Sequence, residues 1–317
     1  MTKAIGGYFE IEKAGNGIFP HSKGILLNTG RNALEYILQL LPDIKKVYLP
    51  YYTCEVVLEP IIKLQLSYSF YHINANFELD SDLSLSEGEY LIVNNYFGIK
   101  DNYIQRLADC YGDQLIVDCS QAFFAPVIAG LKMFYSARKF VGVPDGGIAY
   151  GVDGQFANKL PQDVSESRLD HLYIRRDYGA EAGFKIYQSN EERLDGQYIK
   201  RMSDFTRNVL LNIDYSTIVQ RRFANFKILH AALGYKNAVR VSAEHVVCPM
   251  AYPFYSDSSS LRDFLIKHRI YVAKYWPNVL DWCSVTDLEY SLTNHVIPLP
   301  IDQRYGEEDM KKIIRLL

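Results

Sequence analysis

The first half of the chain alternates between short apolar runs and longer stripes of apolar residues at helical spacing. Runs typical of buried strands lie at 25–27, 47–50, 67–73, 90–95, 115–117 and 133–135. The clearest stripe follows Asn28-Thr29-Gly30 and predicts a helix that Thr29 or Asn28 can cap and that Pro42 ends. Strands that alternate with helices indicate parallel pairing through right-handed crossovers. We therefore predict an α/β fold with a mostly parallel sheet.

The flanking and later segments have a less regular pattern. Residues 8–12 alternate as a strand would, whereas 155–192 are polar and irregular, which is typical of a surface excursion or lid. Two helical stripes follow between 196 and 234. The remainder predicts strands near 246–250, 270–272 and 295–299, with helices at 258–268 and from 307. The pattern thus predicts a large α/β domain over 1–210 and a small α+β domain over 211–317.

Composition narrows the class of protein. The chain has 317 residues, 48% of them hydrophobic, which suffices for a sizeable core in a soluble globular protein. Its net charge of −3 supplies no broad attraction for nucleic acid or for anionic membranes. No apolar run of about 18 residues occurs, and the first residues lack a secretory signal, so we expect a cytoplasmic protein. The five cysteines show no CxxC spacing, which argues against a disulfide framework or a metal site.

The stretch from Ser136 to Gly147 carries the first candidate chemistry. Lys139 follows an apolar strand, so its ammonium is expected at a strand end, where α/β proteins collect ligands. A desolvated amine loses its proton more easily and can attack a carbonyl, and Ser136 can offer a hydroxyl to a phosphate. Gly146 and Gly147 permit a tight turn into the next strand. The alternative is a surface lysine followed by an ordinary glycine turn.

Two further stretches end at the same predicted sheet edge. Gly30, Arg31 and Asn32 begin a helix, where backbone N–H groups and the helix dipole favour an anion such as phosphate. Asp118 comes directly after a buried strand and can hold a cation such as a protonated ring nitrogen. Each has a structural alternative, since glycine before a helix is common and aspartate often caps a turn.

Taken together and in order, these stretches resemble the pyridoxal-phosphate-dependent aminotransferases of fold type I, specifically the DegT/DnrJ/EryC1/StrS sugar aminotransferase family. The segment 29–34 resembles the family's Ser-Gly-Thr-x-Ala-Leu turn, and 117–122 resembles Glu-Asp-x-Ala-Gln-Ala. Residues 136–147 resemble the family's segment around its Schiff-base lysine. Smaller patches match the family at 49–53, 95–98, 201–203 and 297–300. The resemblance implies a fold type I large domain that binds pyridoxal 5′-phosphate.

The resemblance also implies roles for single residues. Lys139 is the expected Schiff-base lysine and proton carrier, and Asp118 the partner of the pyridine nitrogen. The other expected cofactor contacts are Gln121 at the ring oxygen, Tyr52 or its neighbour Tyr51 stacked on the ring, and Gly30, Arg31, Asn32 and Ser136 at the phosphate. The implied reaction moves an amino group from a glutamate-like amino acid to a keto sugar linked to a nucleotide.

The family's usual assembly implies a homodimer whose interface borders the cofactor. We name Arg175 and Arg176 as candidates for contacts across that interface with an anionic substrate or cofactor phosphate, against the alternative of solvated surface charges.

The chain departs from the family pattern at four places. The interval between Asp118 and Lys139 is short, Ser136 precedes the lysine by three residues rather than five, Cys54 stands where an aromatic ring is usual, and Ile199 where an asparagine is usual. These departures keep two alternatives open: a cofactor-dependent lyase or dehydratase-like reaction, and a cofactor-binding protein without turnover. The presence of Lys139 argues against the dehydratase-like relatives, which replace that lysine.

Overall fold

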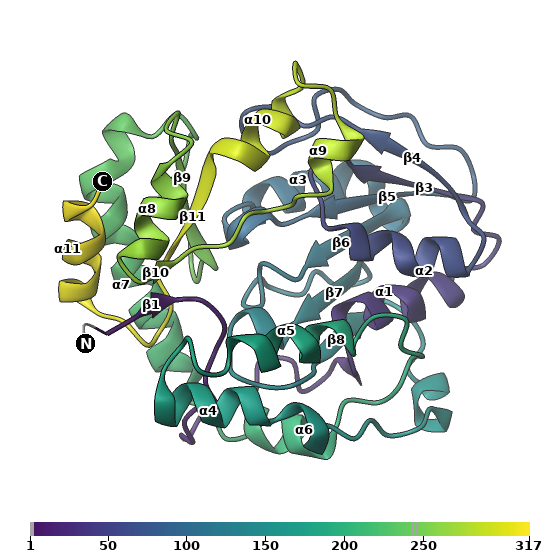
Figure 1. Cartoon of the computed structure of the whole chain (residues 1–317). Coiled ribbons are helices and arrows are strands. Elements are labelled where there is room, and N and C mark those ends of the chain that lie inside the picture. The colour runs from purple at the N-terminus through teal and green to yellow at the C-terminus, as the bar shows by residue number, and fades with distance from the viewer. Residues whose placement is uncertain (1–2, 243, 245) are drawn as a thin grey trace.

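The computed structural model describes residues 3–242, 244 and 246–317 (Figure 1). Its largest element is a seven-stranded sheet in the order β2-β8-β7-β6-β5-β3-β4. The strands are β2 (Ile25–Leu27), β3 (Lys46–Pro50), β4 (Ser67–Tyr71), β5 (Glu89–Asn94), β6 (Leu115–Cys119), β7 (Lys132–Ser136) and β8 (Gly147–Tyr150). Pairing is parallel from β4 to β7, and only β8 runs antiparallel to both its neighbours. The predicted α/β class with a mostly parallel sheet is confirmed.

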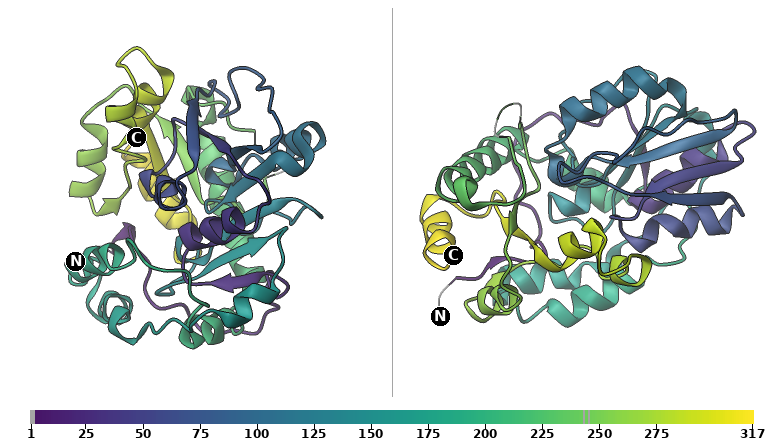
Figure 2. Two further views of the ribbon diagram at one scale, coloured as in Figure 1. Left: turned by 90° about the vertical axis from the view of Figure 1, so that its right-hand side faces the viewer. Right: turned by 90° about the horizontal axis from the view of Figure 1, so that it is seen from above.

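Helices cover both faces of this sheet (Figure 2). Helices α1 (Gly30–Gln39) and α2 (Leu58–Lys63) pack with Ile92 and Ile116, whereas α3 (Asp101–Tyr111) packs with Leu91 and Val117 on the opposite face. Successive strand residues point to opposite faces, so both faces of β5 and β6 are buried. This double cover explains why the sequence shows continuous apolar runs there rather than alternation.

The later part of the chain forms a smaller layered unit. It contains α7 (Tyr215–Leu233), α8 (Leu261–Lys267) and α11 (Glu307–Arg315), whereas α9 (Val279–Trp282) and α10 (Leu288–His295) pack through Val279 and Leu292 into the core beside the seven-stranded sheet. Strands β9 (Ala251–Tyr255) and β11 (Val296–Pro300) pair antiparallel, and β1 (Ile5–Gly6) pairs in parallel with β10 (Ile270–Tyr271). The N-terminal strand therefore lies with the C-terminal half (Figure 1). The predicted boundary after residue 210 coincides with the end of α6 (Asp204–Leu210) and stays a prediction.

Three local predictions were wrong. Residues 8–12 form no strand, because their backbone bonds go to loops: Ile11 N donates to Leu172 O and Glu12 N to Gly142 O. The expected strand at 246–250 lies at 251–255 instead. The segment 155–192 is not irregular, since it holds α4 (Asp170–Tyr178) and α5 (Phe184–Glu192).

The helices α4 and α5 escaped the hydrophobic pattern because polar side chains occupy much of their inner surface. His171, Arg175 and Asn190 are all buried, and Asn190 Nδ2 lies 2.9 Å from His171 Nδ1. None of the described helices is both long enough and apolar enough to cross a membrane.

Candidate active site

The loop that carries Lys139 is packed directly against the start of α1. After β7 the chain makes one 3₁₀ turn, Ala137–Lys139, and returns through Gly146 and Gly147 into β8. Gly146 N donates to Asn28 O at 2.6 Å, and a Cβ on Gly147 would overlap the carbonyl of Thr29. Glycine is therefore required for this close approach. As a result Ser136 and Gly30 lie together, with a Cβ on Gly30 3.6 Å from that of Ser136.

Lys139 and Asp118 meet at Ser120. The Lys139 Nζ donates to Ser120 Oγ at 3.1 Å, and Asp118 Oδ1 accepts from Ser120 N at 2.7 Å. Asp118 is buried at the end of β6, beside β7, where Asp118 pairs in register with Phe134. Burial raises the pKa of the Asp118 carboxyl, although the charge of Lys139 and the bonds from Ser120 oppose the rise. The two side chains predicted from separate strand ends thus share one partner.

Sequence reasoning missed Ser120. The available signal was its place in the segment 117–122, where it stands at the position of an alanine in the motif that this segment resembles. A hydroxyl there can accept from the lysine, which an alanine cannot do.

One hydrogen bond fixes the side-chain oxygen of Gln121, and the side-chain nitrogen takes no part in it. Its Oε1 accepts from Phe97 N at 2.8 Å, which fixes the side-chain amide between two loops. Its Nε2 is buried and has no partner within the described part of the chain. A buried, unpaired amide donor is costly, so it marks a place where a ligand oxygen would be stabilised.

The residues predicted to hold phosphate divide into two groups. Gly30 is the first residue of α1, and Ser136 lies beside it. The Asn32 side chain instead points into the fold, where Nδ2 donates to Gln197 O at 2.9 Å. Arg31 Nη1 is paired with Glu59 and Asp195, both at 2.6 Å. The structure therefore brings Gly30 and Ser136 together, while Arg31 and Asn32 contact protein groups.

Thr29 caps α1, because its Oγ1 accepts from Asn32 N at 3.1 Å. This confirms the predicted cap. The backbone N–H of Asn32 is thereby already occupied.

Tyr52 lies inside an aromatic cluster rather than on an open surface. Its ring is fully buried against Phe77, Tyr96 and Trp276. Burial raises the pKa of its phenol. Tyr51, the alternative stacking residue, is stacked on Phe70.

Cys54, which stands where the family usually carries an aromatic ring, lies near Lys139. Burial raises the pKa of the Cys54 thiol, and the charge of Lys139 opposes that rise. Tyr275, which contacts Trp276, is also buried, and burial raises the pKa of its phenol. Cys54 thus lies near Lys139, and Tyr275 in turn lies near Cys54.

Arg138 is a second basic residue in the lysine turn that sequence reasoning left without a role. Its guanidinium pairs with Glu191 at the end of α5. Burial lowers its pKa, and the charges of Arg31 and Arg168 add to that effect. The contact fastens α5 to the residue that precedes Lys139.

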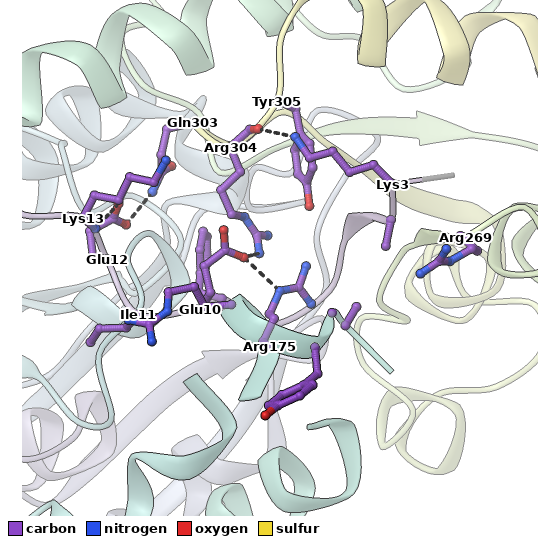
Figure 3. A pocket seen from close by; sticks show the side chains of 16 residues that line it. Lys3, Glu10, Ile11, Glu12, Lys13, Arg175, Arg269, Gln303, Arg304 and Tyr305 are labelled. Atoms are coloured by element: carbon purple, nitrogen blue, oxygen red, sulfur yellow. Dashed lines mark hydrogen bonds and ion pairs between the residues drawn. The ribbon is translucent and has the colours of Figure 1, made fainter. Parts of the chain in front are cut away.

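Arg175 and Arg176 have different surroundings. Arg175 is buried and lines a cavity of about 590 Å³, in which its Nε donates to Glu10 at 3.2 Å (Figure 3). Its Nη2 donates to Gly6 O at 2.7 Å, so its contacts lie within its own chain. Arg176 is about half exposed and pairs with Asp177. Arg175 is therefore buried and Arg176 exposed, and the contact of either with a second subunit stays a prediction.

Comparison with known proteins identifies the fold. No protein-family model matches the sequence, and no curated protein matches it. Solved structures match over nearly the whole chain. A DegT DnrJ EryC1 StrS aminotransferase from Brucella abortus is 15% identical, with a TM-score of 0.60 over 92% of this chain and 84% of that one.

Two other similar structures were solved in states that name a small molecule, one in its PMP form and one in the presence of a TDP-sugar product. The sugar aminotransferase homologue Spr1654 from Streptococcus pneumoniae, in its PMP form, is 15% identical with a TM-score of 0.63, covering 98% of this chain and 92% of that one. DesI, in the presence of its TDP-sugar product, is 13% identical with a TM-score of 0.63, covering 92% and 79%. The chain therefore has the fold of sugar aminotransferases, and the resemblance drawn from its motifs is confirmed at the level of the fold.

Proposed function

We propose that this chain is a pyridoxal-phosphate-dependent aminotransferase. One observation carries the proposal: Lys139 and the buried Asp118 converge on Ser120 at the carboxyl ends of adjacent strands. They do so in a fold shared with sugar aminotransferases, one of them in its PMP form. Ligands of open α/β sheets bind at this edge.

The residues present fit the cofactor. The buried Asp118 carboxylate suits a protonated ring nitrogen, whose positive charge would offset the cost of burying the carboxylate. The unpaired Gln121 Nε2 suits a ring oxygen, and Gly30 with Ser136 suits a phosphate at a helix N-terminus. When bound, the cofactor supplies an electron sink for a carbanion.

Two residues of the chain would then have separate roles in the reaction. Lys139, whose amine donates to Ser120 Oγ, would hold the cofactor through that amine and would carry the proton at the reacting centre. Asp118 keeps the ring nitrogen protonated. The proposed acceptor is a keto sugar linked to a nucleotide, and the proposed donor is a glutamate-like amino acid. The neighbour solved with a TDP-sugar product supports that acceptor class.

We further propose a homodimeric, cytoplasmic enzyme. Exposed apolar side chains gather in the 156–198 segment, the largest exposures being those of Tyr178 at 78% and Tyr198 at 74%. Apolar surface of this kind is typical of subunit contacts, and two-fold dimers are the commonest soluble assemblies.

Reduction of the purified protein with borohydride, followed by peptide mass spectrometry, tests the proposal. We expect one reduced cofactor adduct, on Lys139. Lys139→Ala should lose both the adduct and the absorbance of the bound cofactor while remaining folded. Lys132→Met is the matched control, because Lys132 begins the strand β7 that leads to Lys139 and donates to Asp113 O at 2.8 Å. An adduct on another lysine would refute the assignment.

A further inference from the structure

The backbone carbonyl next to Lys139 is held by two side chains from distant parts of the chain. Phe140 O accepts from Gln303 Nε2 at 2.8 Å and from Arg222 Nη2 at 3.1 Å. Gln303 lies between β11 and α11, and Arg222 lies on α7. The two side chains are also bonded to each other, since Arg222 Nε donates to Gln303 Oε1 at 3.0 Å. We call Arg222 and Gln303 the carbonyl clamp.

Arg222 is fully buried, and within the described residues it forms no ion pair. Burial lowers the pKa of its guanidinium. Carbonyl oxygens offset this cost: besides Phe140 O, Nη1 donates to Met250 O at 3.0 Å and to Pro249 O at 3.4 Å. The guanidinium also lies over the Phe140 ring, 4.7 Å from its centroid. Because its donors are spent on carbonyls, Arg222 joins the lysine loop to the segment before β9.

A third part of the chain braces the same loop. Gln303 Nε2 also donates to Glu12 Oε2 at 2.9 Å, a bond drawn in Figure 3. Glu12 N donates to Gly142 O at 3.2 Å. A Cβ on Gly142 would overlap the carbonyl of Glu10, so the N-terminal segment packs directly on the loop. The lysine loop is thereby held by residues from three separate regions of the sequence.

The clamped carbonyl closes the turn in which Lys139 sits. Phe140 N donates to Ala137 O at 2.9 Å, so residues 137–140 form one short turn. A turn of this length can shift as a unit unless its end is fixed. The clamp fixes that end, and the Lys139 ammonium extends from the turn to Ser120.

We propose that Arg222 and Gln303 are positioning residues for Lys139, which act through the carbonyl of Phe140. This inference rests on the proposed function of Lys139. Its physical basis is that a displacement of about 1 Å at a reacting group can cost about 10²-fold in rate. Neither side chain touches the reacting atoms.

Gln303→Met tests the clamp, because methionine keeps the side-chain length but removes the donor to Phe140. We expect amide hydrogen exchange in residues 138–142 to rise about tenfold, as local opening of the loop becomes easier. Asn225→Leu is the matched control. Asn225 is buried on the same helix as Arg222 and donates to Ile301 O at 3.1 Å and Tyr305 O at 3.0 Å, in the loop that carries Gln303. Its loss should loosen that region but keep the Gln303 donor to Phe140, so exchange at 138–142 should rise clearly less than in Gln303→Met.

A second measurement uses the cofactor-loaded protein. With glutamate as donor, the limiting rate of the absorbance change should fall about tenfold in Gln303→Met, while the half-saturating glutamate concentration stays within about twofold. Arg222→Lys, which keeps the charge but loses the forked geometry, should behave similarly. Equal exchange in Gln303→Met and Asn225→Leu, or unchanged exchange in Gln303→Met, would overturn the inference. The exchange experiment needs no cofactor, so its result is separate from failure of the proposed function.

Discussion

The Asp118 side chain is buried where its ionised form is expensive. Burial raises the pKa of its carboxyl, and the charge of Lys139 and the bonds from Ser120 oppose that rise. A cation from outside the chain would complete the compensation. The free energy that it costs to bury the Asp118 carboxylate is thus an argument that this residue has a function. A purely structural turn cap would not need such burial.

Asp118→Asn should retain bound cofactor but lower turnover by roughly two orders of magnitude or more, because a neutral amide no longer favours a protonated ring nitrogen. Absorbance of the bound cofactor and steady-state assays measure the two effects separately. Asp113→Asn is the control, since that carboxylate is almost fully exposed near the other end of the same sheet. Turnover close to wild type in Asp118→Asn would reduce Asp118 to a turn cap.

Buried histidines give the fold a pH dependence of their own. His21 Nε2 donates to Phe123 O at 2.6 Å, and its Nδ1 lies 3.2 Å from the Tyr150 hydroxyl. Burial lowers its pKa to about 4, so the folded state holds the neutral ring. The unfolded chain binds the proton near pH 6.5. Stability is therefore fully present above that pH and is lost as pH falls from 6.5 towards 4.

For His21 alone this loss is about 3 kcal/mol, on the order of 1.4 kcal/mol for each pKa unit. Urea unfolding at several pH values should show that His21→Leu flattens the acid side of the stability curve. A parallel curve for His21→Leu and wild type would contradict the assignment.

At this scale the sequence sufficed for side chains that directly follow apolar strands. A common location for Lys139, Ser136 and Asp118 could be predicted because the carboxyl ends of parallel strands share one sheet edge, whereas their roles stay predictions. The contacts of Lys139 with Ser120 and of Arg138 with Glu191 could not be predicted, because they depend on loop and helix positions that no period of the sequence encodes. The inward direction of Asn32 also follows from its contact with Gln197, which lies in a distant segment.

Among the elements, α1 joins local sequence signals to the candidate phosphate site. Its apolar side packs under the sheet, and the Thr29 hydroxyl fixes its first turn. The same turn approaches Ser136. The hydrogen bond that caps α1 therefore helps to fix the geometry of the candidate phosphate site.

Thr29→Ala should lower the free energy of unfolding by about 1 kcal/mol, the usual cost of losing an N-cap hydroxyl. Cofactor affinity should fall as well, because the first turn of α1 would fray next to Ser136. Thr29→Ser keeps the hydroxyl and should restore both. Urea unfolding and equilibrium dialysis provide the measurements, and unchanged affinity in a destabilised Thr29→Ala would disconnect the cap from the site.

The elements that sequence reasoning missed have a common cause. Helices α4 and α5 bury polar groups that satisfy one another, such as Asn190 and His171, so their inner faces carry no clear apolar stripe. The false strand at 8–12 has the opposite origin. Its alternation is real, but its hydrogen bonds go to loops that only the complete fold brings near.

At the scale of the whole molecule, the proposed dimer can be tested by sedimentation velocity. We expect a species of twice the 36.4 kDa chain mass. Replacing the exposed Tyr178 and Phe184 by serine should weaken it, since the dimer would no longer be stabilised by burying these two rings. Ile18→Ser is the control, because Ile18 is 90% exposed but lies outside the 156–198 segment. A fully active monomer would exclude a shared site.

The pairing of β1 with β10 has a consequence for the order in which the chain can fold. Gly6 N donates to Tyr305 OH at 2.8 Å across a separation of 299 residues. On the ribosome, the seven-stranded sheet can assemble once residue 150 has emerged, while Ile5 and Gly6 still await their partners. Contacts of such sequence separation form slowly. The small unit therefore closes only after nearly the whole polypeptide has been made, and nascent chains must keep their first strand from pairing elsewhere during translation.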